Sequence, residues 1–343
     1  GRVIGIAVAA VYVGLSAGPF LGGLLTQQFG WRSIFWSYLP LGGLLFVLAL
    51  IHLKGEWADA RGESVDKPGT ALYALALITL MYGISLLPSW RGTGMAAAGL
   101  VLFGTFVYWQ TRTRNPLVSI ELFRDNRPFA FSSLAALINY SATFSFVFLL
   151  SLYLQYVHEL TPRSAGVVLV AQPITMALLS PVAGRLSDRH GSRTIATIGM
   201  GLTGAGLILL TFIGINTGLA YIIACAILLG TGFALFSSPN MSAIIGAVER
   251  RQYGLASGTV STMRLLGQML SMGVATTVMA ILVGREAITP ENQDAFLRAM
   301  RICFVISAGL CGLGIPASLA RGTRHSESES RESQSGRSRS GEV

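Results

Sequence analysis

The chain has 343 residues, of which 52% are hydrophobic and only 12% are charged, and its formal net charge is +9. A soluble domain carries roughly twice that share of charged residues, so the composition excludes a chain of ordinary soluble domains. The apolar residues come in blocks near the ~20 residues that a hydrocarbon layer of about 30 Å requires. We therefore predict an all-α, polytopic membrane protein.

Ten membrane spans are predicted along the chain. They cover residues 3–25, 34–53, 70–88, 95–111, 129–154, 165–183, 194–214, 219–243, 256–283 and 299–320. The sequence opens on Gly1 and runs straight into the first span, with neither an initiator methionine nor a cleavable signal pattern. We expect it to be a fragment. Cys225, Cys303 and Cys311 lie in apolar runs without metal spacing and are expected to be small core residues.

The first span carries a stripe of small residues. Its glycines are Gly14, Gly18, Gly22 and Gly23. Spacing by four places the first three on one face, which lets a neighbouring helix approach closely. Pro19 lacks an N–H group, so the Leu15 carbonyl loses its helical partner and a bend is predicted. Ordinary helix packing is the alternative, because Gly and Pro are common in membrane spans.

Arginines and lysines are unevenly divided between the two sets of loops. One set holds Arg2, Lys54, Arg61, Lys67, Arg112, Arg114, Arg124, Arg127, Arg185, Arg189, Arg193, Arg250, Arg251, Arg321, Arg324, Arg331, Arg337 and Arg339. The other holds Arg32, Arg91, Arg163, Arg285, Arg298 and Arg301. Cytoplasmic loops carry the excess of positive charge, so the first set and the C-terminus are predicted to face the cytoplasm of a cell (inner) membrane. Because the charge is spread over short loops, no nucleic-acid partner is expected.

Three segments outside the spans have compositions of their own. Residues 54–69 mix charges with Gly and Pro and indicate a mobile cytoplasmic linker. Within the connector 112–128, the amphipathic stretch 115–123 either lies along the inner membrane surface or simply packs on helix ends. The tail 321–343, rich in Ser, Arg and Glu, is expected to be disordered because it cannot bury a core.

Among the predicted loops, the segment 184–193 has the most distinctive order of glycine, arginine and aspartate residues. Its candidate functional residues are Gly184, Arg185, Asp188, Arg189, Gly191 and Arg193. A carboxylate between guanidinium groups can lock two helix ends together through charge-assisted hydrogen bonds. A solvated turn that obeys the charge bias would explain the arginines, but not the glycines and the aspartate in this order.

This segment resembles the G-x-L-[SA]-D-R-x-G-R-[RK] loop of the major facilitator superfamily, departing from it at Ser192 and keeping Arg193. The stretch 14–23 resembles the antiporter signature in the fifth helix of that superfamily's drug exporters. Other features similar to the family are Gly30-Trp31-Arg32, Pro239 and Asn240, and the run 254–258 with Arg264 and Gly267.

The resemblance implies the layout of the fourteen-span drug:proton antiporters of the EmrB/QacA type, with the first four helices missing. Residues 1–53 would then be the last two helices of the N-terminal bundle, 54–69 a linker, 70–111 an extra helix pair, 112–128 a connector, 129–320 the C-terminal six-helix bundle, and 321–343 a tail.

Charged residues are almost absent from the predicted spans. Every acidic residue falls in a loop or at a helix end, whereas a proton-coupled exporter needs a buried carboxylate with a raised pKa. The resemblance places such groups in the early helices, which are absent. Arg264 is the one charge well inside a span. A role in the cavity or in gating is one interpretation, and snorkelling or pairing with a carbonyl is the other.

Polar and aromatic residues are candidates for contact with substrate. With Arg264 they are Asn139, Tyr140, Phe144, Phe148, Gln172, Met176, Phe233, Phe236, Asn240 and Gln268, whose family counterparts lie in cavity-lining spans. Aromatic and Met surfaces suit variable apolar substrates because they can repack. For each residue taken singly, core packing or lipid contact is the competing interpretation.

The function implied by the resemblance is proton-coupled efflux of small amphipathic or cationic compounds by alternating access. We expect a monomer in the lipid bilayer, with a small-molecule substrate and protons as partners, no cofactor, no metal and no enzymatic activity. The G-x-S-x-G pattern at 14–18 lies mid-helix, which argues against a hydrolase. The alternatives are a non-transporting remnant or membrane scaffold, and a metabolite symporter or uniporter of the same superfamily.

Overall fold

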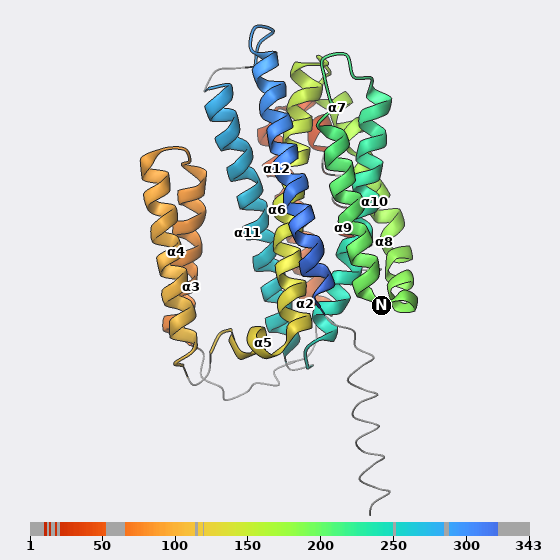
Figure 1. The fold of residues 1–343 in the computed structure, drawn as a ribbon. Helices are drawn as coiled ribbons and strands as arrows, with labels where there is room; N and C mark the ends of the chain where they lie inside the picture. The colour runs from red at the N-terminus through yellow and green to blue at the C-terminus, as the bar shows by residue number, and fades with distance from the viewer. Residues whose placement is uncertain are drawn as a thin grey trace, which may run out of the picture.

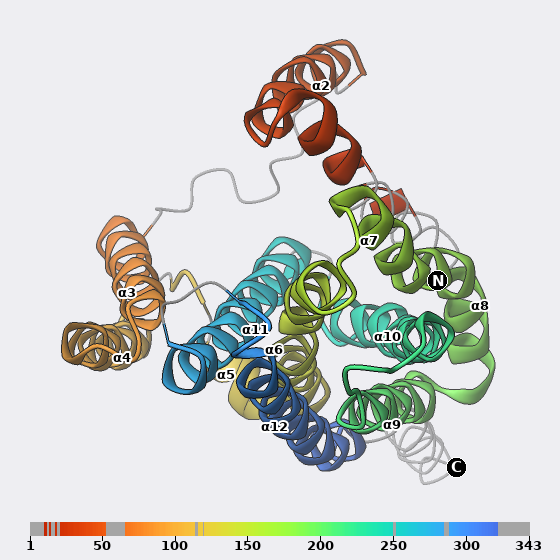
Figure 2. The same cartoon turned by 90° about the horizontal axis from the view of Figure 1, so that it is seen from above.

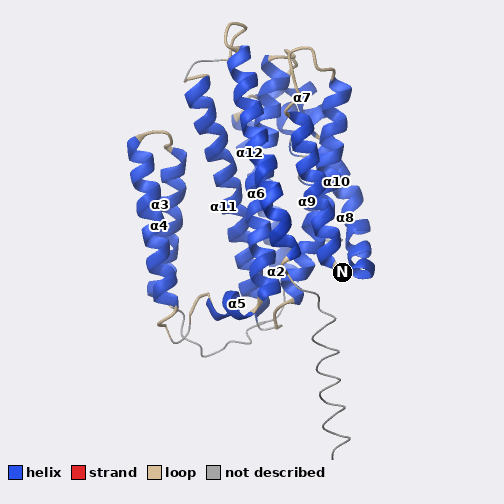
Figure 3. Cartoon of the chain, viewed as in Figure 1, coloured by secondary structure: helices blue, strands red, loops and turns tan. Residues whose placement is uncertain are grey.

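The computed structural model describes residues 10–11, 14, 18, 21–52, 66–113, 116–118, 120–249, 252–284 and 288–321. Across these residues the regular secondary structure is helical, as Figure 3 shows. The prediction of an all-α chain is confirmed for this part of the sequence.

A helical run at 21–29 precedes the long helices. These are α2 (Arg32–His52), α3 (Lys67–Ser85), α4 (Trp90–Gln110), α5 (Ile120–Asp125), α6 (Arg127–Tyr156), α7 (Pro162–Leu169), α8 (Ala171–His190), α9 (Ser192–Leu210), α10 (Leu219–Gly246), α11 (Tyr253–Leu282) and α12 (Gln293–Leu319). In the described residues nine helices are long and apolar enough to cross a membrane, with α7 and α8 counted as one. They confirm the nine spans predicted after residue 30; the first, 3–25, lies mostly outside the described residues.

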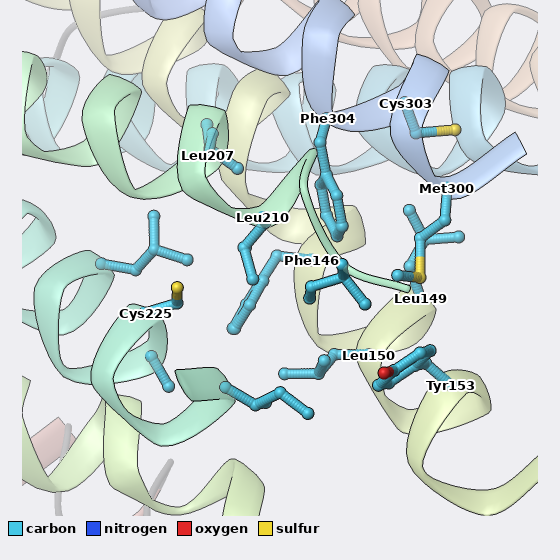
Figure 4. Close-up of a cluster of buried hydrophobic side chains, with 14 of the residues drawn as sticks. Phe146, Leu149, Leu150, Tyr153, Leu207, Leu210, Cys225, Met300, Cys303 and Phe304 are labelled. Atoms are coloured by element: carbon cyan, nitrogen blue, oxygen red, sulfur yellow. The ribbon is translucent and has the colours of Figure 1, made fainter. Parts of the chain in front are cut away.

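Helices α6 to α12 form one bundle (Figures 1 and 2). Helix α6 packs against α11 and α12, and α10 packs against α8 and α9. The core between them holds large side chains, and Phe146, Tyr153 and Phe304 are each at most 1% exposed (Figure 4). The three cysteines are free and buried in this core, as predicted.

Two glycines let α9 and α10 meet backbone to backbone. A Cβ atom at Gly199 would lie 2.5 Å from the backbone nitrogen of Phe236, and one at Gly232 would lie 2.6 Å from that of Thr203. Real Cβ atoms do not approach so closely, so side chains at these two positions would force the helices apart.

Helices α3 and α4 form a separate hairpin beside α11 (Figure 2). Its two helices also touch at glycines: a Cβ atom at Gly99 would lie 2.5 Å from the Cα atom of Leu80. The hairpin meets the bundle at a hydrogen bond between the hydroxyls of Tyr73 and Thr262. The hairpin thus contacts the bundle mainly through α3, which packs beside α11.

Asp66 closes the hairpin at the end opposite its turn. The carboxylate accepts hydrogen bonds from the Gly69 backbone at 2.9 Å, the Gln110 amide at 2.8 Å and the Trp109 indole at 3.2 Å. Burial opposes ionisation, but these bonds outweigh it and lower the pKa of Asp66. Because this cap starts α3 at Lys67, residues 67–69 of the predicted linker are helical; residues 53–65 lie outside the described part.

The span predicted over 165–183 is two helices rather than one. Helix α7 ends at Leu169 and α8 begins at Ala171. Pro173 has no N–H group to donate to the Leu169 carbonyl, which accounts for the break. Helix α8 then runs on to His190, well past the predicted end.

The connector before α6 packs on helix ends. It forms the short helix α5, whose Leu122 and Phe123 pack against Phe129, Ile244 and Ala256. Of the two interpretations of stretch 115–123, the structure therefore supports the packed connector.

The glycines of the first span have few neighbours in the described residues. A Cβ atom at Gly14, Gly18 or Gly22 would meet nothing within 4 Å, whereas one at Gly23 would lie 2.9 Å from the Pro162 carbonyl oxygen. The close approach is thus made by Gly23, which lies beside the stripe, and the approach predicted for Gly14, Gly18 and Gly22 stays a prediction; Pro19 and its bend lie outside the described residues.

Candidate functional site

The motif 184–193 is helical for most of its length. Helix α8 ends at His190, and Gly191, with φ of 83°, is the single residue before α9. Asp188 and Arg189 are exposed, and within the described residues Asp188 forms no ion pair. The structure thus does not show the predicted carboxylate lock, and a gating role for Gly184, Arg185 and Arg193 stays a prediction.

An aromatic cluster joins three helices of the bundle, apart from the main core. It contains Tyr140 of α6, Met176 of α8 and Phe233 of α10, with Ala177 packed beside them. The rings of Tyr140 and Phe233 lie edge to face, with centroids 5.6 Å apart and planes at 66°. Three of the candidate residues are therefore brought together.

Helix α11 adds a charge to this cluster. A Cβ atom at Gly267 would lie 2.7 Å from that of Tyr140, so α11 approaches α6 closely at this level. Arg264, one turn earlier in α11, is exposed and lies on the helix that makes this approach to Tyr140. Ser237 of α10, a residue that the sequence analysis did not select, lies near the hydroxyl of Tyr140.

Four further candidates lie on the same helices. Phe144 is 43% exposed, and Phe148 and Gln268 are half-buried. Gln172 is buried on α8, one turn from Met176.

Three candidates lie instead inside the bundle. Phe236 belongs to the main core, and Asn139 is fully buried. The Asn240 amide nitrogen donates to the Ser132 carbonyl at 3.2 Å, tying α10 to α6. All three side chains thus lie in the interior of the bundle, and their contact with substrate stays a prediction.

Arg321, which the composition assigns to a disordered tail, is instead 2% exposed at the end of α12. Its guanidinium lies over the Phe236 ring, 5.9 Å from the centroid, and forms no hydrogen bond. Burial lowers its pKa to about 10. No pattern in the sequence signals that this arginine turns inward.

The described residues offer no group of three or more His, Cys, Asp or Glu side chains that could hold a metal ion. What the cluster offers a ligand is aromatic surface, a thioether, hydroxyls and one guanidinium. Ligand pockets are lined mainly by such apolar and aromatic groups with a few polar ones.

Comparisons with known proteins identify the fold. The Major Facilitator Superfamily model matches residues 1–161 and 132–341. The riboflavin transporter RibZ of Clostridioides difficile is 27% identical over 92% of this chain and 69% of its own length. The multidrug resistance protein Stp of Mycobacterium tuberculosis is 31% identical over 81% of this chain and 52% of its own. The tetracenomycin C resistance and export protein of Streptomyces glaucescens is 30% identical over 82% of this chain and 53% of its own length.

The chain thus spans about half to two thirds of the length of these curated relatives. Its nine candidate spans, its all-helical architecture and the family match over almost its whole length agree. The chain belongs to the Major Facilitator Superfamily, a family of membrane transporters rather than enzymes.

Proposed function

We propose that this chain is the larger part of an exporter of small amphipathic compounds that works by alternating access between two helical bundles. The observation that carries the proposal is the cluster of Tyr140, Met176, Phe233 and Arg264, because it combines adaptable apolar surface with a charge in membrane-spanning helices. Two of the relatives are named for drug resistance or export, which supports this direction.

In this proposal the helices from α6 to α12 are the C-terminal bundle, residues 1–53 belong to the N-terminal bundle and the α3–α4 hairpin is the extra pair of a fourteen-span antiporter. The four helices that would complete the other bundle lie outside this sequence. The excess of arginine at one end of the bundle supports a cytoplasmic location for that end, including the motif 184–193.

Proton coupling is the least supported part of the proposal. The described acidic residues lie at helix ends or in loops, so these spans offer no carboxylate at mid-membrane to bind a proton. We assign the coupling group to helices outside this sequence. A metabolite transporter of the same superfamily is the second candidate, and the likeness to a riboflavin transporter favours it.

Dye accumulation in a host that lacks its own pumps tests export. Expression of the complete gene should lower the accumulation of a lipophilic fluorescent dye relative to the empty vector. Phe233→Ala should restore much of that accumulation, whereas Phe212→Ala, at a side chain that is 71% exposed, should not. Equal accumulation with and without the protein, at matched membrane levels, would count against export. Collapse of the pH gradient should abolish the effect if protons drive it.

A further inference from the structure

The charge in the aromatic cluster points to a substrate class. We propose, building on the proposed function, that this site selects planar aromatic compounds that are neutral or negatively charged, and that Arg264 sets the selectivity. The sequence alone leaves cationic compounds open; the surroundings of this arginine argue against them.

Arg264 lies far from both ends of α11. Helix α11 runs from Tyr253 to Leu282, and at 1.5 Å per residue Arg264 is about 16 Å along it. Gly267, one turn further along α11, packs against the Cβ atom of Tyr140 of α6, so Arg264 lies beside the contact between two helices of the bundle. Its place beside an aromatic cluster distinguishes it from the arginines at the helix ends.

Arg264 has no counter-ion among the described residues. No ion pair or hydrogen bond joins it to another described side chain, and the nearest acidic residues along its own element lie beyond the helix ends. An ionised group within a membrane span is costly without a partner. A ligand carboxylate or phenolate would supply that partner, whereas a ligand cation would add repulsion in a medium of low dielectric constant.

The aromatic residues beside Arg264 favour flat ligands. Tyr140 and Phe233 present their rings at 66° to one another, and Met176 lies against them. A conjugated ring can pack against a face or an edge of such a pair, and the thioether adjusts to its outline. The hydroxyl of Tyr140 and the amide of Gln268, one turn beyond Arg264, can hydrogen-bond neutral polar groups.

Two dyes with the same ring system and opposite charge test this selectivity. Fluorescein is an anion and rhodamine 123 is a cation, and both share a xanthene ring. Binding to the purified chain in lipid nanodiscs is measured by fluorescence anisotropy. Fluorescein should bind on the order of tenfold more tightly than rhodamine 123, which corresponds to one charge-assisted contact.

Variants assign the preference to one side chain. Arg264→Gln should weaken fluorescein binding on the order of tenfold and leave rhodamine 123 unchanged or tighter, while Arg264→Lys should retain the order of the two dyes. Arg298→Gln, at an exposed arginine near the start of α12, is the matched control and should change neither. Reaction of the buried cysteines with a thiol dye on heating verifies that each variant is folded.

Equal affinities for the two dyes, tighter binding of rhodamine 123, an unchanged affinity in Arg264→Gln, or binding of neither dye would overturn the inference. Export provides an independent outcome. If cells export both dyes without regard to charge, the proposed selectivity is wrong, but the proposed export function is supported. If fluorescein binds selectively but no dye is exported, the proposed binding site is supported and the proposed export function is contradicted.

Discussion

The bundle and the α3–α4 hairpin are held together in different ways. The bundle buries large side chains such as Phe146, Tyr153 and Phe304 in a continuous core. The hairpin buries few side chains, and its helices approach backbone to backbone at Gly83 and Gly99. Lipid tails are as apolar as side chains, so close packing has to supply what the hydrophobic effect supplies in water. A two-helix unit has little interior and relies on glycine; a six-span unit also fills its interior with aromatic residues.

The two regions also carry separate spectroscopic labels. All five tryptophans precede residue 110, whereas all three cysteines follow residue 224 and lie in the bundle. Tryptophan emission therefore reports on the N-terminal part, where Trp90 and Trp109 belong to the hairpin, and reaction of the cysteines with a thiol dye on heating reports on the bundle. Of the variants below, Phe146→Ala, Gly99→Ala and Asp66→Asn should each move one signal and leave the other unchanged.

The largest effect is expected in the bundle core. Phe146→Ala removes a fully buried ring and should lower the free energy of unfolding by about 3–5 kcal/mol, seen as cysteine reaction at lower temperature. Phe212→Ala, at a side chain 71% exposed, should change little. A core made adaptable by repacking would instead show similar, small losses for both variants.

A smaller effect is expected at the helix contact in the hairpin. Gly99→Ala would place a Cβ atom 2.5 Å from Leu80, so the helices must separate at a cost of about 1–3 kcal/mol. Gly104→Ala, on the same helix with nothing within 4 Å, should be neutral or slightly stabilising. Tryptophan emission on heating is the measurement, and the cysteine signal should not move. If both alanine variants behave alike, the glycine contact is not what holds the hairpin.

The cap at Asp66 should make the hairpin sensitive to acid. Because hydrogen bonds lower the pKa of this carboxyl group in the folded state, its contribution is present above the unfolded value of about 3.9 and is lost as pH falls through the lower folded value. Asp66→Asn should cost about 1 kcal/mol at neutral pH and remove that acid-dependent loss. Glu121→Gln, on α5, is the control. A tryptophan melting profile with the same acid dependence in Asp66→Asn would contradict the assignment.

The smallest effect is expected where the two regions meet. Tyr73→Phe removes the hydrogen bond to Thr262, and interhelical bonds in membranes average about 0.6 kcal/mol. A double-mutant cycle with Thr262→Val isolates this coupling, while Tyr82→Phe, 55% exposed, is the control. A coupling of zero would show that the hairpin is held beside α11 by apolar contact alone.

Sequence patterns predict where the helices lie better than which face of each helix is buried. The nine described spans follow from apolar length, but helix α6 is apolar nearly all round, so periodicity could not tell that Asn139 faces the interior and Phe144 the outside. The break between α7 and α8 could have been predicted, because Pro173 has no N–H group to donate to the Leu169 carbonyl. Arg321 and Asp66 were assigned to mobile segments by composition, yet tertiary contacts bury both. The meeting of Tyr140 with Phe233 depends on packing between distant segments.

The one-residue link at Gly191 has a consequence for genetic engineering of this chain. An inserted residue there would change the direction in which α9 leaves α8 and would displace Gly199 from its close contact with α10, so epitope tags are unsuitable at this position. The loop between α9 and α10, residues 211–218, is not a helix and can lengthen without changing helical phase. It is the better site for a tag that reports which end of the bundle is accessible from outside an intact cell.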